Sequence, residues 1–85
     1  EEFILICPNT SVGMAMALAE KLRIVIFDTV FEPENPIAVT ASFGVAAVLP
    51  NEPFSNAFKR ADEALYNAKS LGRNCVIVAE QDNPL

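Results

Sequence analysis

The sequence contains no histidine and only two cysteines among its 85 residues. Without histidine, a metal site would depend on the two thiols and on carboxylates. Cys7 and Cys75 both lie in apolar runs typical of strands. Cysteines in such runs are more often buried free thiols of a cytosolic protein than metal ligands or partners in a disulfide. We therefore expect two free thiols.

Positive charge is also scarce, since the chain has six lysine and arginine residues and a net charge of −5. This balance argues against a surface that binds nucleic acid or an anionic membrane. Six basic residues cannot form a broad basic stripe, although two well-placed ones can still hold a nucleotide. We therefore expect no nucleic-acid partner and no direct membrane contact.

Long hydrophobic runs are absent too, because charged residues interrupt every apolar stretch before the roughly 18 residues that a transmembrane helix needs. No basic segment followed by an apolar one marks a signal peptide. The chain begins with Glu1 instead of methionine, and 52% of its residues are hydrophobic. That share is high for one small domain. We expect an excerpt or a proteolytic product that packs against more protein.

The spacing of apolar residues predicts five elements in the order β-α-β-α-β, with helices layered on a sheet. The expected elements are a strand at about 2–7, a helix from an N-cap at Thr10 or Ser11 to about Val30, a strand at 37–49, a helix from an N-cap at Ser55 to about Leu71, and a strand at 74–79. Proline-rich loops at 31–36 and 50–53 separate them.

Two glycines have positions with structural meaning. Gly44 lies in the middle of the long expected strand, which predicts a bulge or a close approach of another backbone. Gly72 follows the second expected helix, at the position where helices commonly end with a residue in the left-handed conformation. On that helix we expect an inward stripe of Phe58, Ala61, Leu65 and Ala68, and an outward face of Arg60, Asp62, Glu63 and Asn67.

Two pairs of charged residues are candidates for chemistry. Glu1 and Glu2 precede an apolar strand and offer the hard oxygen ligands that Mg²⁺ takes together with substrate phosphates. A terminal acidic pair is, however, usually a solvated chain end. Lys69 and Arg73 lie on either side of Gly72, where the second expected helix ends, and together could bind a triphosphate. Lys69 would act as a point charge, and the planar guanidinium of Arg73 could donate to two oxygens at once. Both residues also have a simpler interpretation. A lysine at the C-terminus of a helix is commonly a favourable partner of the helix dipole, and an arginine just after it is commonly a surface charge.

Three segments taken together resemble the GGDEF domain of the diguanylate cyclase family. Glu1-Glu2-Phe3 resembles the end of the GG(D/E)EF signature. Residues 39–46, VTASFGVA, resemble the family's V-T-x-S-x-G-V-A strand, and residues 61–74, ADEALYNAKSLGRN, resemble its A-D-x-A-L-Y-x-A-K-x-x-G-R-N segment. On this basis residues 1–79 are identified as the C-terminal part of a single GGDEF domain, and residues 80–85 as a polar tail.

The resemblance implies an α+β fold, namely part of a ferredoxin-like, nucleotidyl-cyclase-like domain without its N-terminal strands and helices. In the family, the strand after the signature and the strand at 39–46 flank a central strand from the missing half. Its absence would leave a gap with unpaired edges, which invite pairing with another chain. We therefore expect the N-terminal half as a partner, or a homodimer or oligomer that fills the gap.

The resemblance also implies an activity, because GGDEF domains face each other in pairs and condense two GTP molecules into cyclic di-GMP with release of pyrophosphate. By their positions in the motifs, Glu1 and Glu2 would be catalytic, Glu1 would bind Mg²⁺ or Mn²⁺, and Lys69 and Arg73 would contact the GTP phosphates. The implied setting is second-messenger signalling in the bacterial cytoplasm, with any membrane anchor in upstream regions of the parent protein.

Several family features would precede Glu1: the two signature glycines, a second metal-binding aspartate, the guanine-reading residues and the inhibitory product site. We therefore expect this chain alone to be inactive and to bind no metal. One alternative is a degenerate GGDEF domain that senses GTP or cyclic di-GMP, or that binds proteins. Another is an unrelated small α/β interaction domain, which would bind no guanine nucleotide even with the upstream half present.

Overall fold

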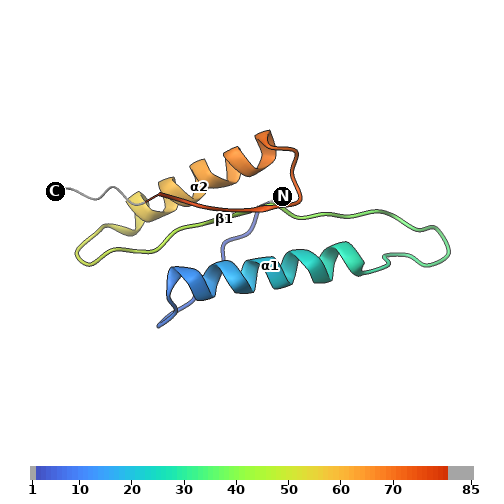
Figure 1. Ribbon diagram of the computed structural model, residues 1–85, viewed down its shortest axis with the longest axis horizontal. Coiled ribbons are helices and arrows are strands. Elements are labelled where there is room, and N and C mark those ends of the chain that lie inside the picture. Colours follow the sequence, from blue (N-terminus) through green and yellow to red (C-terminus); the bar gives the residue numbers. More distant parts are fainter. Residues whose placement is uncertain (1, 81–85) are drawn as a thin grey trace.

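The structure is a computed structural model that describes residues 2–80. Its elements, in chain order, are helix α1 (Val12–Asp28), strand β1 (Phe43–Val45), helix α2 (Phe54–Ser70) and strand β2 (Val76–Val78). Figure 1 shows the strand pair between the two helices. The arrangement is of the α+β class, as the sequence predicts. Glu1 and most of the expected tail, residues 81–85, lie outside the described residues.

The two strands pair in parallel, with Phe43 opposite Val76 and Val45 opposite Val78. The ladder continues one residue beyond each strand. The Phe43 amide donates to the Cys75 carbonyl at 2.9 Å, and the Ala79 amide donates to the Val45 carbonyl at 2.7 Å. A parallel pair needs a crossover connection, and helix α2 provides it.

Helix α1 begins where its N-cap predicts. The Ser11 hydroxyl accepts a hydrogen bond from the Met14 amide at 3.1 Å, which satisfies one of the free amides of the first turn. Of the two candidate caps, Ser11 is therefore confirmed, whereas the Thr10 hydroxyl donates to the Pro8 carbonyl at 2.9 Å. The helix ends at Asp28, two residues before the expected Val30.

Helix α2 begins two residues earlier than expected, at Phe54. Its N-cap is Pro53, which has no side-chain cap bond, so the prediction of Ser55 as N-cap is wrong. The fixed φ of Pro53, −59°, directs the chain into the helix, and its carbonyl accepts from the Asn56 amide at 3.0 Å. Ser55 lies in the first turn instead.

The end of α2 confirms the role of Gly72, whose φ is +110°. The Arg73 amide donates back to the Ala68 carbonyl at 3.0 Å, and the Gly72 amide to the Lys69 carbonyl at 3.4 Å. These two bonds form a Schellman motif, which satisfies carbonyls that a helix end leaves unpaired.

The buried core consists of small side chains, those of Ala19, Ala57, Ala64 and Ala68. Within the expected inward stripe, Ala61 and Leu65 are half-buried, and Phe58 is exposed. The buried stripe of α2 is thus centred on alanines. Small residues let the helix backbone come close to the sheet.

Gly44 of β1 is the point of closest approach. A Cβ atom at this position would lie 2.1 Å from the Ala61 carbonyl oxygen and 2.4 Å from the Leu65 amide nitrogen. Both of these atoms belong to the backbone of α2, so they cannot move aside as a flexible side chain would. The close backbone approach predicted for Gly44 is therefore confirmed.

The strand expected at residues 2–7 is absent: this segment has no regular structure, and the side chains of Phe3, Ile4, Leu5 and Ile6 are exposed. An apolar run becomes a strand only when a neighbouring strand takes up its backbone hydrogen bonds. Within residues 2–80, no strand lies beside it. The observed order is therefore α-β-α-β, and the first element of the prediction is wrong for this chain.

The strand expected at 37–49 is also much shorter, because only Phe43–Val45 pairs with β2. Residues 31–40 are exposed and contribute one isolated bridge, between Phe31 and Ile37. The strand at 74–79 likewise shortens to Val76–Val78. The reason is the same in both cases, since each strand extends only as far as its partner.

Arg60 does not face outward as expected. Its guanidinium donates to the Ala47 carbonyl at 2.6 Å and forms an ion pair with Glu52, which lowers the pKa of the Glu52 carboxyl. Arg60 comes three residues after Ala57 and four before Ala64, so it lies beside the buried stripe. Its outward neighbours Asp62, Glu63 and Asn67 are exposed, as predicted.

Two further expectations concern the cysteines and the membrane. Cys7 and Cys75 are both free thiols, as predicted, although each is half-buried instead of buried. Neither helix in the described part of the chain has the length and apolar character needed to cross a bilayer.

We predict that Gly44→Ala lowers the free energy of unfolding by about 1–3 kcal/mol, the usual cost of overpacking a close contact. The measurement is urea denaturation of a protein that carries both halves of the domain. Gly13→Ala is the matched control, because the nearest atom to its added Cβ is 4.0 Å away. In helix α1 this change should raise stability, by up to about 1 kcal/mol. Equal stability of the two variants would contradict the packing at Gly44.

Candidate functional site

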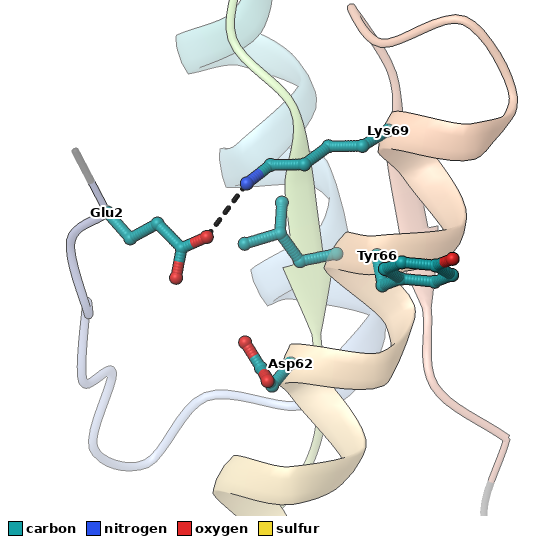
Figure 2. Close-up of a pocket in the computed structure, with 5 residues that line it drawn as sticks. Glu2, Asp62, Tyr66 and Lys69 are labelled. Atoms are coloured by element: carbon teal, nitrogen blue, oxygen red, sulfur yellow. Dashed lines mark hydrogen bonds and ion pairs between the residues drawn. The ribbon is translucent and has the colours of Figure 1, made fainter.

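A hollow of about 260 Å³ on the surface of α2 is lined by residues from both ends of the sequence: Glu2, Asp62, Leu65, Tyr66 and Lys69. The four α2 residues follow the spacing i, i+3, i+4 and i+7, which places them on one face of the helix. Glu2 comes from the irregular N-terminal segment, which passes in front of that face (Figure 2).

The central contact is an ion pair between Lys69 and Glu2, which are 67 residues apart in sequence. The Lys69 ammonium donates to Glu2 Oε2 at 2.7 Å, and the two side chains are 35% and 58% exposed. The hydrogen bond from Lys69, and then its charge, hold the pKa of the Glu2 carboxyl below its usual range. An exposed ion pair is weak in water, so Lys69 can exchange Glu2 for another anion.

Asp62 places a second carboxylate in the same hollow, one helical turn from Tyr66, whose ring turns away from the ion pair (Figure 2). Two carboxylates near each other repel unless a cation lies close to them. However, residues 2–80 contain no group of three or more side chains that could hold a metal ion. The described residues therefore do not complete a metal site, and Glu1 lies outside them.

Arg73 follows the end of α2, with a φ of +65°, and its neighbour Asn74 has a φ of +52°. The left-handed region costs an ordinary residue such as arginine roughly 1–2 kcal/mol, whereas asparagine visits it readily. The Arg73 side chain is exposed, and it makes no hydrogen bond or ion pair with any residue between 2 and 80. Lys69 and Arg73 thus lie at the same end of α2, and of these two side chains only that of Lys69 has a partner within residues 2–80.

A second polar network reaches this turn from α1. Arg23 Nη1 donates to Asn74 Oδ1 at 3.0 Å, and the Asn74 amide donates to Ser42 Oγ at 3.0 Å. Arg23 is held in turn by Glu20, with Nε donating to Glu20 Oε2 at 2.9 Å and a second bond from Nη2 to Oε1. The ion pair raises the pKa of Arg23 and lowers that of Glu20, so both stay charged.

The structure thus brings together two of the four site residues predicted from the sequence, Glu2 and Lys69. Sequence reasoning missed Asp62 and Tyr66, although their spacing from Lys69 on the helix could have found them. It also missed Arg23, which lies off the apolar stripe of α1 and reaches a residue 51 positions away. No local sequence signal points to that contact.

The sequence matches the family described as "Diguanylate cyclase, GGDEF domain" over residues 1–75. The chain belongs to the GGDEF family. It is 40% identical over 80 residues to diguanylate cyclase DgcP of Pseudomonas aeruginosa, a match that covers 93% of this chain and 12% of that protein. Membership of the GGDEF family, which the three motifs indicated, is therefore confirmed.

Two solved structures are similar to this GGDEF chain. One is the active GGEEF domain of a diguanylate cyclase from Vibrio cholerae, with a TM-score of 0.79, 30% identity, and coverage of 89% of this chain and 49% of that one. The other is the GGDEF domain of DgcB from Caulobacter crescentus in complex with c-di-GMP, with a TM-score of 0.81, 29% identity, and coverage of 88% and 45%. The GGDEF fold is confirmed, and this chain spans about half the length of each.

We predict that Lys69→Met raises the pKa of Glu2 toward its usual value, because the change removes the two largest causes of the lowering, the hydrogen bond from Lys69 and its charge. Carbon-13 NMR of the Glu2 carboxyl during a pH titration measures it. The stabilising effect of the ion pair is present at neutral pH and is lost as the pH falls through the lowered pKa. Lys59→Met removes a lysine of the same helix and should leave Glu2 unchanged. A titration of Glu2 that is insensitive to Lys69→Met would contradict the ion pair.

Proposed function

We propose that this chain supplies catalytic carboxylates and phosphate-binding cations to a diguanylate cyclase domain, which condenses two GTP molecules into cyclic di-GMP and releases pyrophosphate. The observation that carries the proposal is the contact between Glu2 and Lys69. It joins the GG(D/E)EF signature to the A-K-x-x-G-R-N segment in one hollow. The similarity to an active GGEEF domain of a diguanylate cyclase supports it.

The proposed reaction requires neutralisation of phosphate charge. The 3′ hydroxyl of one GTP loses its proton, which passes to solvent, and its oxygen forms a bond to the α-phosphorus of the other GTP. The bond from that phosphorus to the pyrophosphate oxygen breaks. Negative charge grows on the leaving pyrophosphate, and cations placed beside it lower the barrier. In our proposal Lys69 contributes a point charge and Arg73 a planar fork that can bind two phosphate oxygens at once.

The ion pair between Lys69 and Glu2 gives the proposed site a resting state. Before nucleotide binds, the Glu2 carboxylate neutralises the Lys69 ammonium at the surface. When a triphosphate arrives, its oxygens replace Glu2 as the partner of Lys69, at little cost because both side chains are exposed. Glu2 is then free to take its catalytic role beside Glu1.

Glu1 is the proposed ligand of Mg²⁺ or Mn²⁺, since it occupies the variable acidic position of the signature. Such an ion, when bound, would neutralise phosphate charge. Because residues 2–80 do not complete its site, we assign the remaining ligands to the upstream half of the domain. For the same reason we propose that this chain alone is inactive.

We further propose that two complete domains face each other in a dimer in the bacterial cytoplasm, each presenting one GTP to the other. Because the product joins two identical nucleotides through two equivalent bonds, a symmetric pair of sites fits its chemistry. A structure similar to this chain was solved in complex with c-di-GMP, which supports the assignment of the product.

The first test is an assay of a protein that carries both halves of the domain, incubated with GTP and Mg²⁺. We predict that it forms cyclic di-GMP, and that Glu1→Gln abolishes product because an amide is a poor replacement for a metal-binding carboxylate. Glu63→Gln, the same substitution on the exposed face of α2, should leave the rate unchanged. GTP binding without product would identify a degenerate sensor domain instead. No binding of nucleotide would contradict the proposed function.

A second prediction concerns the two cations. Lys69→Met and Arg73→Gln should each lower kcat/KM by roughly tenfold to a hundredfold, since each removes a hydrogen bond to a charged group. Arg73→Lys should fall between Arg73→Gln and the unchanged protein, because it keeps the charge and loses the fork. Lys59→Met is the control for removal of a helix lysine. Equal kinetics of the Lys69→Met and Lys59→Met variants would contradict the role of Lys69.

A further inference from the structure

We propose that Arg23 is a positioning residue for Arg73, which it fixes through the side chain of Asn74. This inference rests on the proposed role of Arg73 as a phosphate-binding residue. Arg23 belongs to α1, on the other side of the strand pair from α2 (Figure 1). It lies outside the hollow at Glu2 and Lys69, and none of the three sequence motifs includes it.

The need for such a residue arises from the backbone of the turn that follows α2. Gly72, Arg73 and Asn74 all have positive φ values, of +110°, +65° and +52°. Glycine and asparagine adopt this region readily, whereas arginine does so only where the surrounding structure holds it. Arg73 is therefore the strained residue of the turn. If its φ relaxed to a negative value, its side chain would leave the direction set by the turn.

Hydrogen bonds restrain the backbone on both sides of the Arg73 Cα atom. On the N-terminal side, the Arg73 amide donates to the Ala68 carbonyl of α2 at 3.0 Å. On the C-terminal side, the Asn74 backbone amide donates to Ser42 Oγ, and Asn74 Oδ1 accepts from Arg23, both at 3.0 Å. The turn is thus tied to α2, to the segment before β1 and to α1.

The bond from Arg23 is well suited to this task. Its donor is charged, which makes the hydrogen bond stronger than one between neutral groups. The Arg23 side chain is only 19% exposed, and two of its guanidinium nitrogens are held by Glu20. The third nitrogen, Nη1, therefore donates to Asn74 from a fixed position. A lysine could not replace these three bonds, because its ammonium lacks the planar, rigid arrangement of donors.

The test is a double-mutant cycle in a protein that carries both halves of the domain. The probe is a GTP analogue with a methylene group between the α and β phosphorus atoms, and its Kd is measured by isothermal titration calorimetry. We expect Arg73→Gln to weaken binding by roughly tenfold or more, and Arg23→Gln by roughly threefold to tenfold. The double variant should bind as Arg73→Gln does, because the position of the turn no longer matters without the Arg73 fork.

Arg60→Gln is the matched control. The Arg60 side chain is 20% exposed, close to the 19% of the Arg23 side chain, and it also forms an ion pair, with Glu52. It lies in the N-terminal half of α2, away from the turn at 72–74, and its loss should reduce stability without changing Kd. Combined with Arg73→Gln, it should add nothing to the loss of affinity. This variant separates a general loss of stability from a loss of positioning.

Asn74→Gly is the second variant, used together with a denaturation curve for each protein. Glycine keeps the positive φ and removes Oδ1, while the pair of Arg23 with Glu20 stays intact. It should lower affinity as Arg23→Gln does, so the test does not depend on one variant folding well.

The outcomes separate this inference from the proposed function. An unchanged Kd for Arg23→Gln would overturn the positioning role and leave the role of Arg73 intact. The same conclusion would follow if Arg23→Gln weakened binding equally in the Arg73→Gln background and in the unchanged protein. An unchanged Kd for Arg73→Gln would overturn both. Loss of affinity in Arg23→Gln that disappears in the Arg73→Gln background supports the inference.

Discussion

The contact between Gly44 and the backbone of α2 determines where the candidate site lies. A Cβ atom at Gly44 would collide with the Ala61 carbonyl oxygen, and the buried residues of α2 are all alanines. Because the helix and the strand meet backbone to backbone, α2 has little freedom to shift or rotate on the sheet. Its C-terminal end, with Lys69 in the last turn and Arg73 just beyond it, is therefore held in one place relative to β1.

The turn at residues 72–74 serves both the fold and the proposed chemistry. It reverses the chain after α2 so that β2 enters the sheet in parallel register with β1. The same turn carries Arg73 in a left-handed conformation and connects it, through Asn74, to Arg23 of α1. In our account, the bonds that close the fold also orient a phosphate-binding cation. A substitution in this turn would then affect stability and nucleotide affinity together.

The sequence predicted those features whose causes lie within a few residues of each other. Ser11 caps α1 through an amide three residues away, and Gly72 has the left-handed conformation that ends α2. The sequence failed where structure depends on distant partners. The apolar run at 3–6 forms no strand because no strand lies beside it in the described chain, and the strand expected at 37–49 extends only as far as its contact with β2. For the site, Lys69 and Glu2 were predicted from their positions in the motifs. The contact of Arg23 with Asn74 could not be predicted, because no local sequence pattern indicates it.

The most direct measurement is a crystal structure of a protein that carries both halves of the domain, bound to the methylene analogue of GTP. Our account predicts that the Lys69 ammonium has left Glu2, and that Lys69 and the Arg73 guanidinium both lie within hydrogen-bond distance of phosphate oxygens. It also predicts that Arg23 still donates to Asn74 in that complex. Phosphates bound away from the end of α2, with Lys69 still paired to Glu2, would contradict the account.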